Sequence, residues 1–145
     1  MLPASIRGSC RDDPTEQWIV DPKQSEPPAL AQVNCESAEV GNDYLTYGLW
    51  ESPTKARDWL KNVKKFYSSS SSTDACNSRI KTAMQSELPQ AESGCVDIVN
   101  KGDARKGIVM AWNEDQSPVA GDFHLVDNHN QEAALKKWKE VVKAP

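Results

Sequence analysis

Four cysteines are the residues whose type and spacing bear most directly on chemistry: Cys10, Cys35, Cys76 and Cys95. They are separated by 24, 40 and 18 residues, whereas a zinc site usually gathers its thiolates in close pairs such as C-x2-C. An even number of widely spaced cysteines favours a disulfide framework formed in an oxidising compartment. We therefore expect two structural disulfides, and we keep free buried cysteines and a metal site as alternatives.

Four cysteines allow three pairings, and sequence alone does not choose among them. Loop size and the internal repeat described below favour Cys10 with Cys35 and Cys76 with Cys95. Each such bridge closes a loop of about 20 to 26 residues, which stabilises a fold by roughly 3 kcal/mol. Neither spacing matches the C-x-x-C of a redox pair, so we expect both bridges to be structural.

Both histidines of the chain lie in one short segment with two acids, Asp122, His124, Asp127 and His129. On a strand, Asp122 and His124 share one face. Asp127 and His129 fall at the turn before the last expected helix, where polar groups cap the helix and contact water. We therefore expect no metal site and no cofactor, with a weak divalent-metal site at these four residues as the alternative.

Acidic residues also follow two tryptophans at the ends of expected strands: Glu51 follows Trp50, and Glu114 and Asp115 follow Trp112. Paired carboxylates can perform acid/base catalysis, but acids at strand ends are ordinarily solvated. The sequence contains no G-x-S-x-G elbow, no phosphate-binding glycine loop and no H-E-x-x-H. We therefore expect a protein that is not an enzyme.

The net charge and the N-terminal segment indicate which class of partner and which cellular location to expect. A net charge of -4 argues against a nucleic-acid partner, and we interpret the lysine-rich segments 61–65 and 136–139 as solvated helix faces. Residues 2–10 form an amphipathic segment rather than a signal peptide, and no run of 18 apolar residues could span a membrane. With oxidised cysteines, these features indicate an extracytoplasmic mature protein or excised ectodomain, joined to a membrane only through a segment outside this sequence.

Two halves of the chain show a similar order of elements. The first half is expected to contain a helical turn at 2–10, a loop at 12–28, strands at 29–36 and 44–50, and a helix that begins at Pro53 behind the capping residue Ser52. That helix has one apolar stripe, formed by Ala56, Trp59, Leu60, Val63 and Phe66. The serine run Ser68–Ser72 is expected to be a flexible linker.

The second half is expected to contain a helix at 76–89, strands at 94–100, 107–114 and 119–126, and a last helix. Asn128, with Gln131 three residues later, resembles a capping box for that helix. Its apolar face contains Ala134, Leu135, Trp138, Val141 and Val142.

The repeated order indicates an internal duplication of halves 1–67 and 73–145 within a single domain, 1–145. We expect an α+β two-layer sandwich with about five antiparallel strands and helices on one face. Aromatic residues gather on its central strands, so Tyr44, Tyr47, Trp50 and Trp112 form the candidate ligand-binding face. Core packing beneath the helices is the alternative role for these four residues.

The layout of LPASIRGSC, a second cysteine on a strand, YLTYGLWESPTKARDWL, GCVDI and GIVMAWNEDQ covers most of the chain. It resembles the extracytoplasmic domain of actinobacterial membrane-anchored serine/threonine protein kinases and related surface lipoproteins. The resemblance implies a non-catalytic, disulfide-bearing sensor or ligand-binding module with an unknown ligand or protein partner. The alternative is a secreted inhibitor or protein-interaction domain that presents the loop at 12–28.

Overall fold

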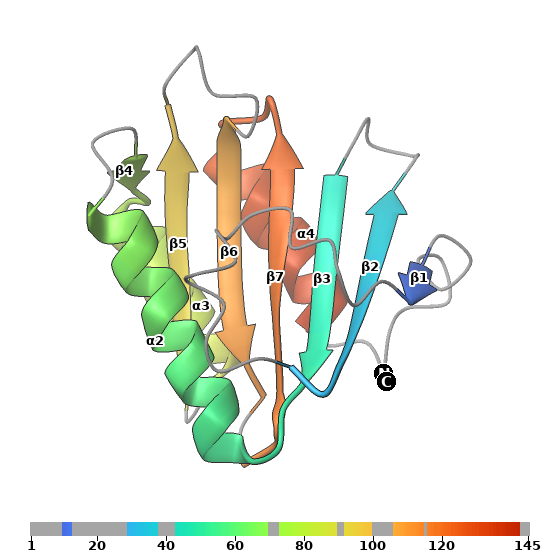
Figure 1. Ribbon diagram of the computed structural model, residues 1–145. Coiled ribbons are helices and arrows are strands. Elements are labelled where there is room, and N and C mark those ends of the chain that lie inside the picture. Colours follow the sequence, from blue (N-terminus) through green and yellow to red (C-terminus); the bar gives the residue numbers. More distant parts are fainter. Residues whose placement is uncertain are drawn as a thin grey trace.

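One antiparallel sheet organises the molecule (Figure 1). The computed structural model describes residues 10–12, 29–37, 43–69, 73–89, 92–99, 106–114 and 116–142. Within these residues the strands are β1 (Cys10–Asp12), β2 (Ala31–Ser37), β3 (Asp43–Leu49), β4 (Thr73–Ala75), β5 (Ser93–Ile98), β6 (Gly107–Asn113) and β7 (Val119–Val126). The helices are α2 (Pro53–Ser69), α3 (Ser78–Glu87) and α4 (Gln131–Val142). The seven strands lie in the order β1-β2-β3-β7-β6-β5-β4.

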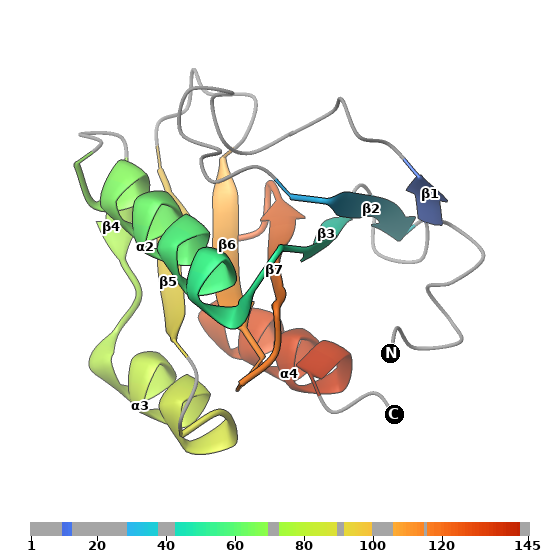
Figure 2. The ribbon, with the colours of Figure 1, turned by 60° about the horizontal axis from the view of Figure 1, so that its bottom comes forward.

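Helices cover both faces of this sheet, with α2 on one side and α3 and α4 on the other (Figure 2). The α+β class is therefore confirmed, but the expected two layers with helices on one face, and the expected five strands, are wrong. The reason lies in β6, all seven residues of which are buried. Ile108 and Met110 pack with α3 and α4, while Val109 packs with α2. A strand that is apolar on both faces needs cover on both faces.

Helix α2 begins as the sequence predicts. The backbone N–H of Lys55 donates to the hydroxyl of Ser52 at 3.2 Å, and Pro53 occupies the first helical position. Four residues of the expected apolar stripe are buried against the sheet, namely Ala56, Trp59, Leu60 and Val63. The helix continues to Ser69, so the first two serines of the expected linker are helical.

The two helices on the other face are capped by asparagines. The Oδ1 of Asn77 accepts from the N–H of Ile80 at 2.9 Å and begins α3. Helix α4 is capped by Asn130, whose Oδ1 accepts from the N–H of Ala133, so the expected cap at Asn128 is two residues too early. Gln131 does not close a capping box, because its Oε1 accepts from the N–H of Asn77 instead.

Both edges of the sheet are short strands beside a cysteine. Cys10 lies in β1 and not at the end of a helix, and it is the register partner of Cys35 in β2. At the opposite edge, β4 was not expected, and Cys76 directly follows it. The order β1-β2-β3 on one side of β7 matches β4-β5-β6 on the other. This order is compatible with a duplication, which stays a prediction.

Candidate functional site

The four aromatic residues of the expected binding face do not come together. Trp50 is 3% exposed and stacks on Trp59 of α2, with ring centroids 4.7 Å apart. Trp112 is 1% exposed and meets Trp138 of α4 on the opposite face of the sheet, at 6.4 Å and in an edge-to-face arrangement. Both tryptophans are core residues, which agrees with the alternative of core packing, and their ligand-binding role stays a prediction. Their separation follows from the side-chain alternation of strands, which places them on different faces.

Of the two tyrosines of that expected face, Tyr47 is less deeply buried than the tryptophans. Tyr47 lies half-buried on the α4 side of β3, 6.4 Å from the ring of Trp112. Tyr44 is the register partner of His124 in β7, and its side chain lies outside the described residues. Gly48, which follows Tyr47 in β3, makes room for the Trp50 ring, because a Cβ there would lie 2.6 Å from it. This close approach explains how Trp50 lies back against the sheet beneath α2.

One complete disulfide, Cys76–Cys95, is present among the described side chains. Its Cα atoms are 5.5 Å apart, and both residues are at most 5% exposed, in the core between the sheet and α3. Cys35 is also disulfide-bonded. The side chain of Cys10 lies outside the described residues, so the expected second bridge from Cys10 to Cys35 stays a prediction. Burial makes the Cys76–Cys95 bridge structural rather than an exposed redox pair.

A polar cluster lies at the centre of the sheet, on the side of α2. It consists of Thr46 from β3 and Asp122 and His124 from β7, which are at most 9% exposed. Asp122 lies directly opposite Thr46 on one side and Ala111 on the other. Asp122 and His124 share one strand face, as the sequence predicts. We call these three residues the central polar cluster.

Asp122 is the chemically unusual member of the central polar cluster. Its side chain is fully enclosed, and its Oδ1 has no hydrogen-bond partner. Burial raises its pKa from 3.8 to about 7, although hydrogen bonds from the Thr46 side chain and from its own backbone act to lower the pKa. A carboxyl group with this pKa gains or loses a proton near neutral pH.

The surroundings of Asp122 are otherwise apolar. Ala111, Ala120 and Trp50 belong to the same core cluster on this face, together with the buried side of α2. The helix lies over β4, β5, β6 and β7. The central polar cluster therefore lies at the edge of α2, where β7 meets β3. Desolvation of an acid is strongest in such apolar surroundings.

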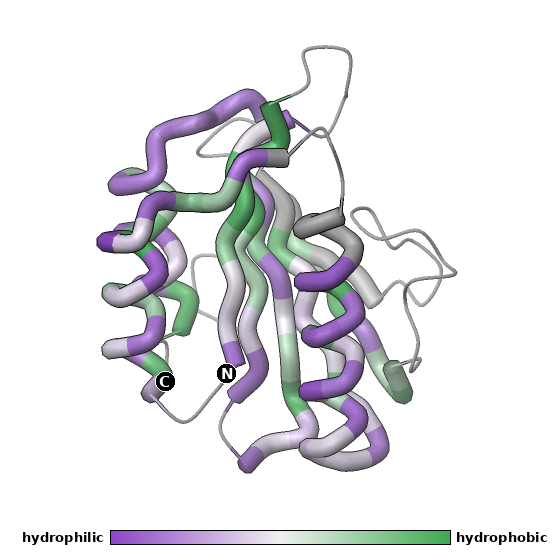
Figure 3. Tube along the Cα trace, turned by 90° about the vertical axis from the view of Figure 1, so that its left-hand side faces the viewer, coloured by the Kyte–Doolittle hydropathy of each residue, from purple (hydrophilic) through white to green (hydrophobic). Residues whose placement is uncertain are grey.

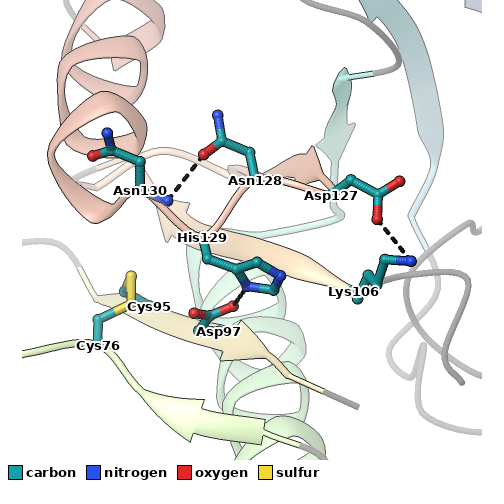
Figure 4. A network of polar contacts seen from close by, with 8 residues as sticks. All are labelled: Cys76, Cys95, Asp97, Lys106, Asp127, Asn128, His129 and Asn130. Carbon is teal, nitrogen blue, oxygen red and sulfur yellow. Dashed lines mark hydrogen bonds and ion pairs between the residues drawn. A yellow bond between two sulfur atoms is a disulfide. The ribbon is translucent and has the colours of Figure 1, made fainter. Parts of the chain in front are cut away.

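A second polar network ties the loop before α4 to β5 (Figure 4). The Nδ1 of His129 lies 2.5 Å from the Oδ1 of Asp97, which is two residues after Cys95 on the same face of β5. The carboxylate is almost buried, whereas 45% of the imidazole is exposed. An imidazole oriented by a carboxylate can exchange protons through its other nitrogen. Here the pair also holds the loop next to the disulfide-bonded edge.

The neighbours of His129 have structural partners of their own. Asp127 forms an ion pair with Lys106 at 3.0 Å, and the Oδ1 of Asn128 accepts from the backbone N–H of Asn130 at 2.9 Å. The four residues of the alternative metal site are thus divided. Asp122 and His124 lie in the central polar cluster, whereas Asp127 and His129 lie in the loop before α4. Among the residues that the structure describes, no group of three or more His, Cys, Asp or Glu side chains is placed to hold a metal ion.

The acids after the tryptophans lie at one end of the sheet without forming a close pair. Glu51 follows β3 and Glu114 follows β6, two parallel strands that are separated by β7. Two strand spacings place these ends about 10 Å apart. Asp115 lies outside the described residues. Glu51 and Glu114 are therefore not a close carboxylate pair that could act on one reacting group.

Two residues of these networks were missed by sequence reasoning, Thr46 and Asp97. Thr46 lies in the aromatic strand YLTYGLW, and Asp97 interrupts the apolar strand GCVDI. A polar residue within a strand that is otherwise apolar was the available signal, since the buried strands of a covered sheet are nearly continuous in apolar residues.

Comparison of the chain with protein-family models, with curated proteins and with solved structures gives no match. Across the described ranges, no helix has both the length and the hydropathy to cross a membrane.

Proposed function

We propose that this chain is an extracytoplasmic sensor or ligand-binding module that performs no reaction of its own. The resemblance of its motif layout to the ectodomains of membrane-anchored serine/threonine kinases supports this assignment, and such a kinase is the proposed parent protein. The buried disulfide Cys76–Cys95 supports the extracytoplasmic location, because disulfides persist in oxidising compartments. Pairing of Cys10 with Cys35 in the adjacent strands β1 and β2 is part of the same proposal.

The unpartnered carboxylate oxygen of Asp122 is the observation that carries the binding role. Leaving a buried polar atom without a partner costs about 1–3 kcal/mol, and such exceptions concentrate at functional sites or where a further molecule completes the hydrogen bonds. A ligand that donates a hydrogen bond to Asp122 Oδ1 would remove this cost. The central polar cluster at the edge of α2 is therefore the proposed binding site.

The chemistry of the cluster restricts the ligand. A carboxylate accepts hydrogen bonds, and its charge favours a donor that is itself cationic. Ala111, opposite Asp122 in β6, and Ala120 on the same face of β7 favour a compact ligand with apolar carbon atoms next to the donor. Amines, guanidinium compounds and polyols are the classes that meet these conditions.

Thermal unfolding at pH 8 with a panel of small amines, guanidinium compounds and polyols tests this function. The wild type is compared with Asp122→Asn and with Asp74→Asn, a matched change at an exposed aspartate of β4. We expect at least one class to raise the Tm of the wild type and of Asp74→Asn, with a smaller rise in Asp122→Asn. Equal shifts in all three proteins, or no shift with any compound, would contradict a binding site at Asp122.

A further inference from the structure

Charge is unevenly distributed between α2 and the rest of the chain. Residues 53–69 contain five basic residues and one acidic residue, whereas the whole chain has 17 basic and 21 acidic residues. The remaining residues therefore contain 12 bases and 20 acids. The helix has a net charge of +4 and everything else has a net charge of -8. Helix α2 is thus a concentrated positive element of a net negative protein.

The positive charge lies on the exposed side of α2. Lys55, Lys61 and Lys65 are exposed, while Ala56 and Leu60 on the other side are fully buried against the sheet. Figure 3 views the sheet from its β4 edge, with hydrophilic turns along the outward side of α2. The eleven residues from Lys55 to Lys65 extend over about 15 Å of helix. We call these three lysines the α2 lysine row.

The other helices do not repeat this arrangement. Helices α3 and α4 together contain five basic and three acidic residues. Two of these bases form ion pairs between the two helices: Arg79 of α3 pairs with Glu132 of α4, and Lys139 of α4 pairs with Glu87 of α3. On α2, Lys64 points toward the sheet and pairs with Glu92 at 3.2 Å, outside the row. Asp58 is the single acid on the exposed side of α2.

We propose that the α2 lysine row docks the domain on an anionic lipid bilayer. This surface role is independent of the proposed ligand site at Asp122. Charge complementarity identifies the partner: a bilayer with anionic headgroups attracts each nearby lysine by about 1 kcal/mol. The negative remainder of the chain orients the domain, because the same field repels it and turns α2 toward the surface.

The shape of the α2 lysine row favours a flat surface over a polyanionic chain. The row lies on the outward side of a helix, a convex cylindrical surface whose opposite side packs on the sheet. Tight binding of single-stranded nucleic acid uses aromatic residues for base stacking, whereas the tryptophan of α2, Trp59, is buried with its ring on Trp50. The apolar side of α2 is also in the core, so the helix would rest on the headgroups without insertion.

Co-sedimentation with vesicles tests the proposal. The full chain is mixed with vesicles of phosphatidylcholine alone, and with vesicles that contain one-third phosphatidylglycerol, at low and at high salt. The variant Lys55→Glu/Lys61→Glu/Lys65→Glu reverses the charge of the α2 lysine row. The control variant Lys81→Glu/Lys136→Glu/Lys137→Glu makes the same change of net charge on α3 and α4, across the sheet. Circular dichroism verifies that both variants are folded.

We expect the wild type and the control variant to bind the anionic vesicles at low salt, and to dissociate at high salt because the interaction is screened. The row variant should bind at least about tenfold more weakly. Three results would overturn the proposal: no binding of the wild type to anionic vesicles, an equal loss in the control variant, or tighter binding to soluble polyphosphate or an oligonucleotide than to vesicles.

Discussion

The two faces of the sheet are built differently. The face toward α3 and α4 carries an apolar core that includes the disulfide, and Trp112 and Trp138 meet edge to face within it. The face toward α2 also contains a tryptophan pair, Trp50 with Trp59, but the central polar cluster lies beside it. The indole N–H of Trp138 on the first face also has no hydrogen-bond partner, but the α2 face buries an ionisable group, Asp122, whose desolvation lowers stability at high pH. We attribute this difference to function on the α2 side.

Truncation of a tryptophan on the apolar face is expected to have the largest effect. Trp138 is fully buried, so Trp138→Ala should lower the free energy of unfolding by about 3–5 kcal/mol. Trp59 is 5% exposed, so its burial is confirmed together with that of Trp138, and Trp59→Ala should cost a similar amount. Urea denaturation measures both values. A loss below 1 kcal/mol for either variant would mean that the corresponding helix does not pack as described.

Removal of the charge of Asp122 should stabilise the protein at high pH. Because the pKa of Asp122 is raised to about 7 in the fold and is 3.8 in the unfolded chain, the folded state keeps its proton longer. The stability that this proton provides is complete below pH 3.8 and is lost as the pH rises to about 7. The loss amounts to about 4 kcal/mol at most.

The difference in unfolding free energy between wild type and Asp122→Asn isolates this effect, since all other groups titrate equally in both proteins. We expect Asp122→Asn to gain stability relative to wild type between pH 4 and pH 7 and to be the more stable protein at pH 8. Asp74→Asn, at an exposed aspartate of β4, is the matched control for the removal of one carboxylate. A difference between wild type and Asp122→Asn that does not vary with pH would exclude a buried acid at this position.

Loss of the disulfide is expected to have the next largest effect on the free energy of unfolding. The double variant Cys76→Ser/Cys95→Ser opens a loop with a sequence separation of 19 and should lower the free energy of unfolding by about 3 kcal/mol. Intact mass after alkylation of the native wild type should show no free thiol. Labelling of Cys76 or Cys95 in the folded protein would contradict the bridge, and labelling of Cys10 would contradict only its proposed pairing with Cys35.

The smallest expected effect distinguishes two asparagines at the start of α4. Asn130 caps the helix, so Asn130→Ala should cost about 1 kcal/mol. Asn128 accepts a single hydrogen bond from within the turn, so Asn128→Ala should cost less. Thermal unfolding of the two variants measures the order, and a larger loss for Asn128→Ala would restore the cap that the sequence predicted.

The sequence predicted local elements better than their assembly. Ser52 and Pro53 marked the start of α2 correctly, because the capping signal is local. The number of layers was predicted wrongly, although the unbroken apolar run of β6 indicated cover on both faces. The short strands β1 and β4 exist through pairing with β2 and β5, and such pairing leaves little signal in three residues.

The sequence failed to predict the candidate site for a different reason. In β7 the polar residues Asp122 and His124 alternate with the apolar residues Phe123 and Leu125, a pattern typical of a strand with one solvated face. The structure buries that polar face beside α2. Their burial depends on the cover over the α2 side of the sheet, which no local pattern in β7 specifies.

Titration of the Asp122 carboxyl carbon by 13C NMR tests the central claim most directly. Asp122→Asn assigns the resonance. We predict a midpoint near pH 7 for Asp122, because its carboxyl group is enclosed and one oxygen has no partner. A midpoint near pH 4 would show a solvated or fully hydrogen-bonded carboxylate, and it would contradict a special role for the α2 face.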